Sequence, residues 1–184
     1  MAVGLELGLA PAALRTVGLG ALLHDIGKLE IDDAVLHKPG KLNAEEFEHI
    51  KTHTTEGERL VLGSPGLADL GPTVRHHHER IDGRGYPDGL AGDDIPLTAR
   101  IVSVCDAYDA MVHTRQYRAG MGDERARAVL IEHRGAQWDP EIVDALLELS
   151  DRGAIASTPT VLADLAGQVG HSCTHELPEP ATVT

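Results

Sequence analysis

The chain has 184 residues, a formal net charge of −13 and 42% hydrophobic but only 3% aromatic residues. This length suits one globular domain, and a core that lacks aromatics favours packed helices built from Leu, Val, Ile and Ala. The acidic charge argues against binding to a nucleic-acid polymer. No stretch approaches the roughly 20 apolar residues of a membrane span, and Cys105 and Cys173 match no zinc or redox spacing, so we expect a cytoplasmic protein without a membrane contact.

The first half of the chain predicts two helices. Apolar positions at helical spacing after a proline predict a helix over 11–23, which places His24 at its C-terminal end. A loop follows. Asn43, with Glu46 three residues later, has the capping-box pattern that begins a helix. This second helix carries His53 on its apolar side.

The second half predicts further helices around a glycine-rich loop. Pro72 begins a short helix that continues to Glu79 and carries three consecutive histidines. Residues 82–96 are too rich in Gly and Pro for a regular helix and predict an ordered loop with Gly85-Tyr86-Pro87 at its tip. The remaining helices are expected from Thr98, around 124–133 and 140–149, and at 161–169. We therefore predict an all-α domain of about six to seven helices over 1–150 and a flexible tail over 151–184.

Metal-binding chemistry is indicated first by the adjacent pair His24-Asp25, with Lys28 within one turn. A carboxylate can bridge two divalent ions while a neighbouring histidine holds one, and a lysine can contact a phosphoryl oxygen. Such a dipeptide by itself is usually structural. The triplet His76-His77-His78 favours a site, because three consecutive histidines on one helix cannot all be core residues.

Further candidate ligands lie on two other predicted helices. His49 and His53 have the i, i+4 spacing that can hold one ion, although one of them can equally face solvent; we favour His53 because it lies on the apolar side. Asp106 and Asp109 lie on an otherwise apolar helix, where an uncompensated carboxylate would be costly. Asp106 is the better candidate ligand, whereas Asp109 can cap a loop or pair with an arginine.

Arg115 and Arg118 form a small basic cluster in an acidic chain. Their guanidinium groups can bind phosphate oxygens bidentately, and ordinary surface pairing is an equally good interpretation. With the carboxylates, histidines and lysine above, they complete the parts of a two-metal phosphohydrolase. No serine or cysteine is placed as a nucleophile, which fits attack by water at metal ions.

Several segments together resemble one family, the HD-GYP proteins, which are phosphohydrolases of the HD superfamily. The matching segments are LLHDIGK at 22–28, KPGKL at 38–42, HTTEG at 53–57, HHERIDGRGYPDGLAGDDIPLTARI at 77–101, CDAYDAM at 105–111 and GAQWDPEIVDALL at 135–147. The resemblance implies a bacterial signalling enzyme that hydrolyses cyclic di-GMP to pGpG, and further to GMP, by in-line attack of a metal-bridging hydroxide. It implies a helical HD-type bundle with two, sometimes three, iron or manganese ions.

The resemblance also implies roles for individual residues. The metal ligands that it carries over are His24, Asp25, His53, His77, His78 and Asp106, with Asp25 bridging. Lys28, Arg115 and Arg118 would contact the substrate phosphates, and Asp25 and Lys28 would take part in catalysis. The loop Gly85-Tyr86-Pro87 would lie beside the substrate and contact diguanylate cyclase domains. A homodimer is also expected.

The chain departs from the family pattern in two places. Family members usually carry a further histidine ligand before the HD pair, but no histidine precedes His24, which predicts either a truncated chain or a more weakly held ion. Gln116 stands where proline is usual. The missing histidine favours one alternative function, a catalytically weak module that binds cyclic di-GMP or a cyclase. A second alternative is an HD phosphohydrolase for another nucleotide, because the HD core alone also serves other nucleotide hydrolases. In the tail, the cluster of His171, Cys173 and His175 has the residue types to bind a metal, but we interpret it as incidental because no surrounding residues hold these side chains in place.

Overall fold

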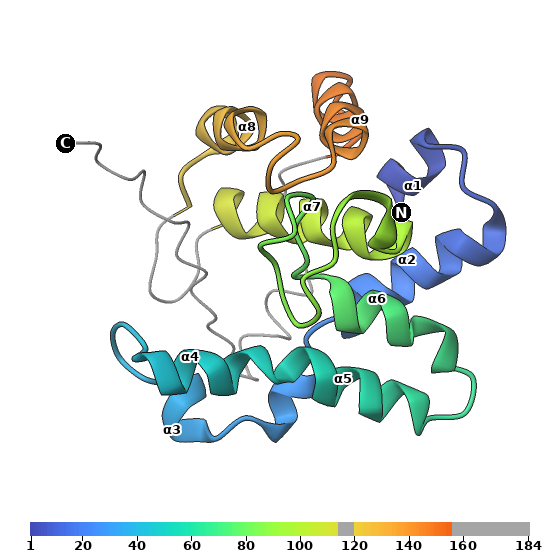
Figure 1. Cartoon of the computed structure of the whole chain (residues 1–184). Helices are drawn as coiled ribbons and strands as arrows, with labels where there is room; N and C mark the ends of the chain where they lie inside the picture. Colours follow the sequence, from blue (N-terminus) through green and yellow to red (C-terminus); the bar gives the residue numbers. More distant parts are fainter. Residues whose placement is uncertain (114–119, 156–184) are drawn as a thin grey trace.

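Figure 1 shows the computed structural model of the chain, which describes residues 1–113 and 120–155. The regular elements of these residues are helices, so the all-α prediction is confirmed. The α-helices are α1 (Ala2–Glu6), α2 (Pro11–Leu23), α3 (Asp33–Leu36), α4 (Ala44–Lys51), α5 (His53–Leu62), α6 (Gly71–His76), α7 (Leu97–Val112), α8 (Asp123–Glu132) and α9 (Pro140–Asp151). Short 3-10 helices are η1 (Ile26–Glu30), η2 (Ala68–Leu70) and η3 (Gly92–Asp94). None of the described helices has the length and apolarity that spanning a membrane requires.

Helix α7 is the centre of the fold. It contacts α2, α6, α8 and α9, and in Figure 1 it runs between α8 and α9 on one side and the α4–α5 segment on the other. Its buried residues Ile101, Val104 and Met111 belong to the largest apolar cluster, together with Leu130 of α8 and Leu146 of α9. Burial of these side chains makes α7 a rigid support for the polar residues on its other face.

A second group of elements packs α5 against η1 and α6. Glycine makes this contact close: a Cβ atom on Gly27 would lie 1.9 Å from the carbonyl oxygen of His53 and 2.4 Å from the nitrogen of Gly57. The η1 backbone therefore lies directly on the α5 backbone. This contact brings the residues just before η1, His24 and Asp25, to the first turn of α5.

Most predicted helices are confirmed. The bounds of α2 agree with the predicted range 11–23, and the capping box forms, with Glu46 N donating to Asn43 Oδ1 at 2.9 Å and Asn43 N donating to Glu46 Oε2 at 2.8 Å. Helices α7, α8 and α9 lie where their apolar patterns place them. The short helix α6 ends at His76, before the expected Glu79.

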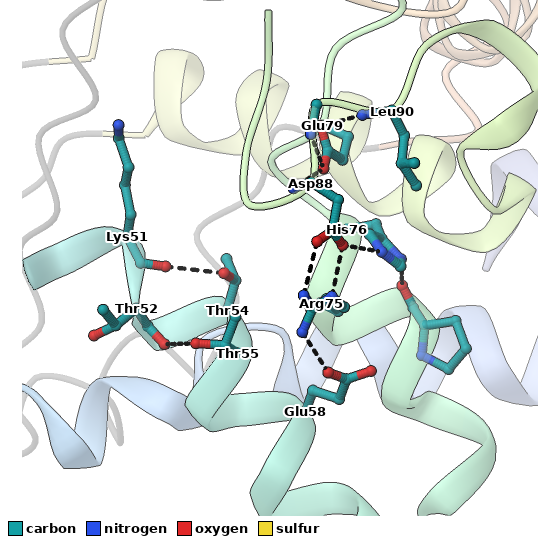
Figure 2. A network of polar contacts seen from close by, with 12 residues as sticks. Lys51, Thr52, Thr54, Thr55, Glu58, Arg75, His76, Glu79, Asp88 and Leu90 are labelled. Carbon is teal, nitrogen blue, oxygen red and sulfur yellow. Dashed lines mark hydrogen bonds and ion pairs between the residues drawn. The ribbon is translucent and has the colours of Figure 1, made fainter. Parts of the chain in front are cut away.

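The described part of the chain has more helices than the six to seven expected. One reason is that the helix after Asn43 is interrupted at Thr52. Thr52, Thr54 and Thr55 each donate a side-chain hydrogen bond to a carbonyl three residues earlier, and two of these bonds are drawn in Figure 2. Such bonds compete with regular helix hydrogen bonds. The other reason is that α1 and α3 are too short for a periodic pattern. The helix expected at 161–169 and most of the predicted tail lie outside the described residues.

Candidate metal centre

Four predicted ligands meet in one cluster. Asp25, His53, His77 and His78 each offer an atom that can bind a metal, and these atoms all lie within 4.8 Å of one another. The Nε2 atoms of His53 and His77 are 3.3 Å apart, and Asp25 Oδ1 lies 3.5 Å from His53 Nε2. His53 and His77 are each only 1% exposed. This group, in which His53 and His77 are buried and Asp25 and His78 are partly exposed, can hold a divalent metal ion.

The other two predicted ligands adjoin this cluster. His24 Nε2 lies 3.1 Å from Asp25 Oδ2 and 3.8 Å from Asp106 Oδ1, and the His24 ring lies 5.0 Å from that of His77. The six residues come from four parts of the fold: the end of α2, the start of α5, the end of α6 and the middle of α7. The tertiary fold therefore gathers the whole set that the sequence predicted.

The histidines are oriented by the backbone. In His24, His53 and His77, Nδ1 faces the carbonyl oxygen of the residue three positions earlier. The distances are 2.9 Å to Ala21, 2.6 Å to Ile50 and 2.6 Å to Val74. A carbonyl oxygen only accepts hydrogen bonds, so Nδ1 carries the proton in each ring and Nε2 is turned toward the cluster. Backbone contacts of this kind hold histidine ligands in place for a metal.

This arrangement fits a cation. With the proton on Nδ1, the Nε2 lone pairs of His53 and His77 face each other at 3.3 Å, beside the carboxylate of Asp25. Three groups that can only accept repel one another unless a proton or a cation lies between them. Imidazole nitrogens combined with a carboxylate are a ligand set for divalent transition metals. The residues present therefore fit the metal ions that the HD-GYP resemblance implies.

The histidines His24 and His77 differ in pKa and therefore in charge. Burial lowers the pKa of His24, but the hydrogen bond and charge of Asp25 outweigh it and raise that pKa to about 9. Burial likewise would raise the pKa of Asp25, yet His24 and Lys28 hold it well below its ordinary value. The pKa of His77 is lowered by burial and by the positive charge of His24. Without metal at neutral pH, His24 is a cation and His77 is neutral.

Lys28 lies at the cluster itself. Its side chain is only 8% exposed, and Nζ donates to Asp25 Oδ2 at 2.6 Å. Together with the larger effect of His24, this contact holds the pKa of Asp25 low and keeps its carboxyl in the anionic form that a bridging ligand needs. The sequence predicted a phosphate contact for this lysine, and the structure places its ammonium group beside the carboxylate expected to bridge the metals.

The glycine-rich loop lies against the histidines. The Tyr86 ring is 4.9 Å from the His78 ring and 6.5 Å from the His53 ring. At Gly85, a Cβ atom would lie 2.4 Å from both Glu79 Cα and Arg80 N, so the loop touches the backbone that follows the histidine triplet. The predicted position of the loop tip beside the site is thus observed.

Glu79 anchors this loop, a role that sequence reasoning missed. Its side chain is 3% exposed, and its carboxylate accepts hydrogen bonds from three successive backbone nitrogens. The distances are 2.7 Å to Asp88 N, 3.0 Å to Gly89 N and 3.1 Å to Leu90 N. A buried carboxylate requires such partners. The signal was available, because a glutamate directly after the histidines precedes a loop whose backbone N–H groups lack regular partners.

A second anchor joins the loop to two helices, as Figure 2 shows. The Asp88 carboxylate accepts from Arg75 Nε at 2.6 Å and lies 2.9 Å from His76 Nε2. Arg75 also donates to Glu58 of α5 at 2.7 Å. His76 is therefore the member of the histidine triplet that pairs with Asp88, whereas His77 and His78 belong to the metal cluster.

The remaining candidates lie away from the cluster or outside the described residues. His49 lies 3.7 Å from Asp32, not among the ligands, which agrees with the preference for His53. The side chain of Asp109 is 61% exposed and pairs with His113 at 3.0 Å. Arg115 and Arg118, the predicted phosphate contacts, lie outside the described residues, and so does the cluster of His171, Cys173 and His175.

Comparison with known proteins decides the family. The sequence pattern that defines the HD domain family matches residues 1–142. The chain belongs to the HD domain family. This HD domain is 45% identical over 144 residues to a cyclic di-GMP phosphodiesterase response regulator of Xanthomonas campestris, covering 77% of the chain and 38% of the relative. It is 42% identical over 146 residues to a cyclic di-GMP phosphodiesterase of Thermotoga maritima, covering 78% of the chain and 40% of the relative. It is 38% identical over 143 residues to a 3'3'-cGAMP-specific phosphodiesterase of Vibrio cholerae, covering 77% of the chain and 27% of the relative. The chain thus spans less than half the length of these relatives.

Solved structures confirm the HD-type bundle. A cyclic GMP-AMP-specific phosphodiesterase of Vibrio cholerae superposes with a TM-score of 0.68 at 19% identity, covering 91% of this chain and 45% of that one. A protein of the HDG"Y"P type from Bdellovibrio bacteriovorus superposes with a TM-score of 0.62 at 25% identity, covering 82% and 48%. The first likeness shows the fold, and the second also supports the HD-GYP resemblance carried by the motifs.

Proposed function

We propose that this HD domain is a metal-dependent phosphodiesterase that hydrolyses cyclic di-GMP to pGpG and further to GMP. The observation that carries the proposal is the cluster of Asp25, His53, His77 and His78, whose ligand atoms lie within 4.8 Å of one another. It supports the proposal because backbone contacts turn the Nε2 atoms of His53 and His77 inward, as metal ligands require. Similarity to cyclic di-GMP phosphodiesterases supports the substrate.

The proposed ligand set has Asp25 as its bridging member. Its Oδ2 faces His24 Nε2 at 3.1 Å, and its Oδ1 faces His53 Nε2 at 3.5 Å. Two carboxylate oxygens directed at different histidines suit a carboxylate shared between two ions. The proposed ligands are His24, Asp25, His53, His77, His78 and Asp106, holding two or three ions of iron or manganese. Imidazole and carboxylate ligands suit these metals.

The ions, when bound, would stabilise charge on the phosphoryl oxygens and make water acidic enough to attack phosphorus at neutral pH. The chain's own residues have supporting roles. Lys28 keeps Asp25 ionised and lies close enough to the cluster to contact a phosphate oxygen. Tyr86, packed on His78, forms a wall of the site. Arg115 and Arg118 are proposed as phosphate contacts.

The proposal has three further parts. A cytoplasmic location is proposed, because a cyclic dinucleotide substrate and a free thiol at Cys105 both suit that compartment. The ordered loop around Gly85 is proposed as the contact for a diguanylate cyclase domain, as the family resemblance implies, and a homodimer is proposed as well. A second substrate, 3'3'-cGAMP, deserves a parallel assay, because similar relatives in Vibrio cholerae are specific for it.

The test is hydrolysis of both dinucleotides by the purified chain after anaerobic loading with iron(II) or manganese(II), with products separated by chromatography. Asp106→Ala and Asp109→Ala form a matched pair, because both remove a carboxylate from α7, but Asp106 lies 3.8 Å from His24 whereas Asp109 is 61% exposed and pairs with His113. We expect pGpG or GMP from the wild type and from Asp109→Ala, and little from Asp106→Ala or Asp25→Ala. Bound metal without turnover would contradict the proposal and favour the binding-module alternative.

A further inference from the structure

Beyond the metal cluster, one lysine lies over two aromatic rings. Lys51 Nζ lies 4.8 Å from the ring centroid of Phe47 and 5.7 Å from that of Tyr86. Phe47 is the single phenylalanine of the chain and is 40% exposed. An ammonium group placed on two ring faces is a cation–π arrangement. The aromatic residues of the chain are few, so two of them beside one cation form a distinctive surface.

These residues form a continuous path from the metal cluster to the surface. The Tyr86 ring lies 4.9 Å from the His78 ring and 6.5 Å from the His53 ring, and it also contacts Lys51. Tyr86 therefore lies between Lys51 and the proposed ligands. Phe47 lies one turn before Lys51 on α4. A substrate whose phosphate binds at the metals would therefore extend a base toward these three side chains.

Lys51 is able to bind a new partner. Its ammonium pairs with Glu48 Oε1 at 2.6 Å, but the Glu48 side chain is 70% exposed. Exposed ion pairs contribute little to stability, because water screens them. The ammonium can therefore move from Glu48 to the edge of a base while that base covers the ring of Phe47. Neither movement requires a change in the metal cluster.

The chemistry of this surface selects among bases. An ammonium group only donates hydrogen bonds. Guanine presents two adjacent acceptors, O6 and N7, whereas adenine presents N7 beside an amino donor. Aromatic rings stack on every base and add affinity without distinguishing among them. Lysine would thus supply the preference for guanine, and the rings would supply general affinity.

We propose that Phe47, Lys51 and Tyr86 form a guanine-binding subsite next to the metal centre. Lys51 donates to O6 and N7 of the base, and Phe47 stacks on its face. The inference rests on the proposed phosphodiesterase function, since it assigns one base of that substrate. It also agrees with the names of the relatives, because cyclic di-GMP and 3'3'-cGAMP each contain at least one guanine.

The test measures equilibrium binding of GMP and AMP to the manganese-loaded chain, together with KM and kcat for cyclic di-GMP and cyclic di-AMP. GMP and AMP are not cyclic substrates, so their binding reports on the subsite even if the chain does not hydrolyse cyclic di-GMP. We expect the wild type to prefer GMP by about 5- to 150-fold. Lys51→Met should abolish this preference, and Lys51→Arg should keep it. Phe47→Leu should weaken both nucleotides about equally, by about 5-fold or more.

A control separates the subsite from general electrostatics. Lys38→Met removes the same charge from a lysine that pairs with Glu46 and contacts neither ring, so it should leave the preference unchanged. Manganese content should be normal in all variants, because none of these residues belongs to the cluster. The inference is overturned if the wild type binds AMP as tightly as GMP. It is also overturned if Lys51→Met keeps the preference or weakens both nucleotides equally.

Discussion

Replacement of Glu79 by glutamine should loosen the glycine-rich loop. In the wild type, Oε1 accepts from the backbone nitrogens of Asp88 and Gly89, and Oε2 accepts from that of Leu90. Glutamine keeps one oxygen, which can still serve two N–H groups. Its NH2 group, however, must take the place of the second oxygen and would face the N–H of Leu90, so one hydrogen bond is lost and two donors oppose each other.

The magnitude follows from these contacts. A hydrogen bond to a charged group contributes roughly 1.5–3 kcal/mol, and water can reach the exposed residues Asp88 and Gly89 once the bonds weaken. We therefore expect Glu79→Gln to lower the free energy of unfolding by about 2 kcal/mol. That corresponds to a fall in Tm of about 4–8 °C for a chain of this size. Glu79→Ala, which removes all three bonds, should cost about 3–4 kcal/mol.

The assay combines thermal unfolding with hydrogen exchange at the amides of residues 88–90. We expect faster exchange there and a raised KM for cyclic di-GMP, because Tyr86 is no longer held on His78, while metal content stays normal. Glu48→Gln is the control, since Glu48 is 70% exposed and its replacement should change Tm little. An unchanged Tm with unchanged exchange in Glu79→Gln would refute the anchoring role.

Three other predictions concern the metal centre. Gly27→Ala should destabilise the fold by more than about 3 kcal/mol and reduce metal content, because the new Cβ would lie 1.9 Å from the His53 carbonyl oxygen. Chemical denaturation measures the stability, and metal analysis measures the metal content. A fold of normal stability would contradict the close contact. Manganese affinity should rise roughly tenfold per pH unit from pH 7 to about 9, because His24, whose pKa is about 9, must lose its proton to bind the ion. A manganese affinity that does not change with pH would exclude His24 as a ligand. Manganese at 100 times its Kd should stabilise the wild type by about 2.7 kcal/mol but not Asp25→Asn, and equal stabilisation of both would argue against Asp25 as a ligand.

Local sequence patterns were sufficient for most of the helices, and the family motifs named the candidate ligands. The helix over 11–23 and the capping box of Asn43 and Glu46 depend on contacts within a few residues, so their signals are visible in the chain. The family motifs named six ligands, and the fold brings these six together. The same reasoning missed the break at Thr52, because side-chain bonds to the backbone override helical periodicity there.

Only the tertiary structure decided how these residues are arranged. The two oxygens of Asp25 face different histidines because η1 lies on the α5 backbone at Gly27, a contact between segments far apart in the chain. Glu79 holds a loop nine to eleven residues ahead of it, and Lys51 lies beside Tyr86 of that loop. Periodicity and capping report contacts within one helix. These arrangements depend instead on packing between elements, which leaves no periodic signal in the sequence.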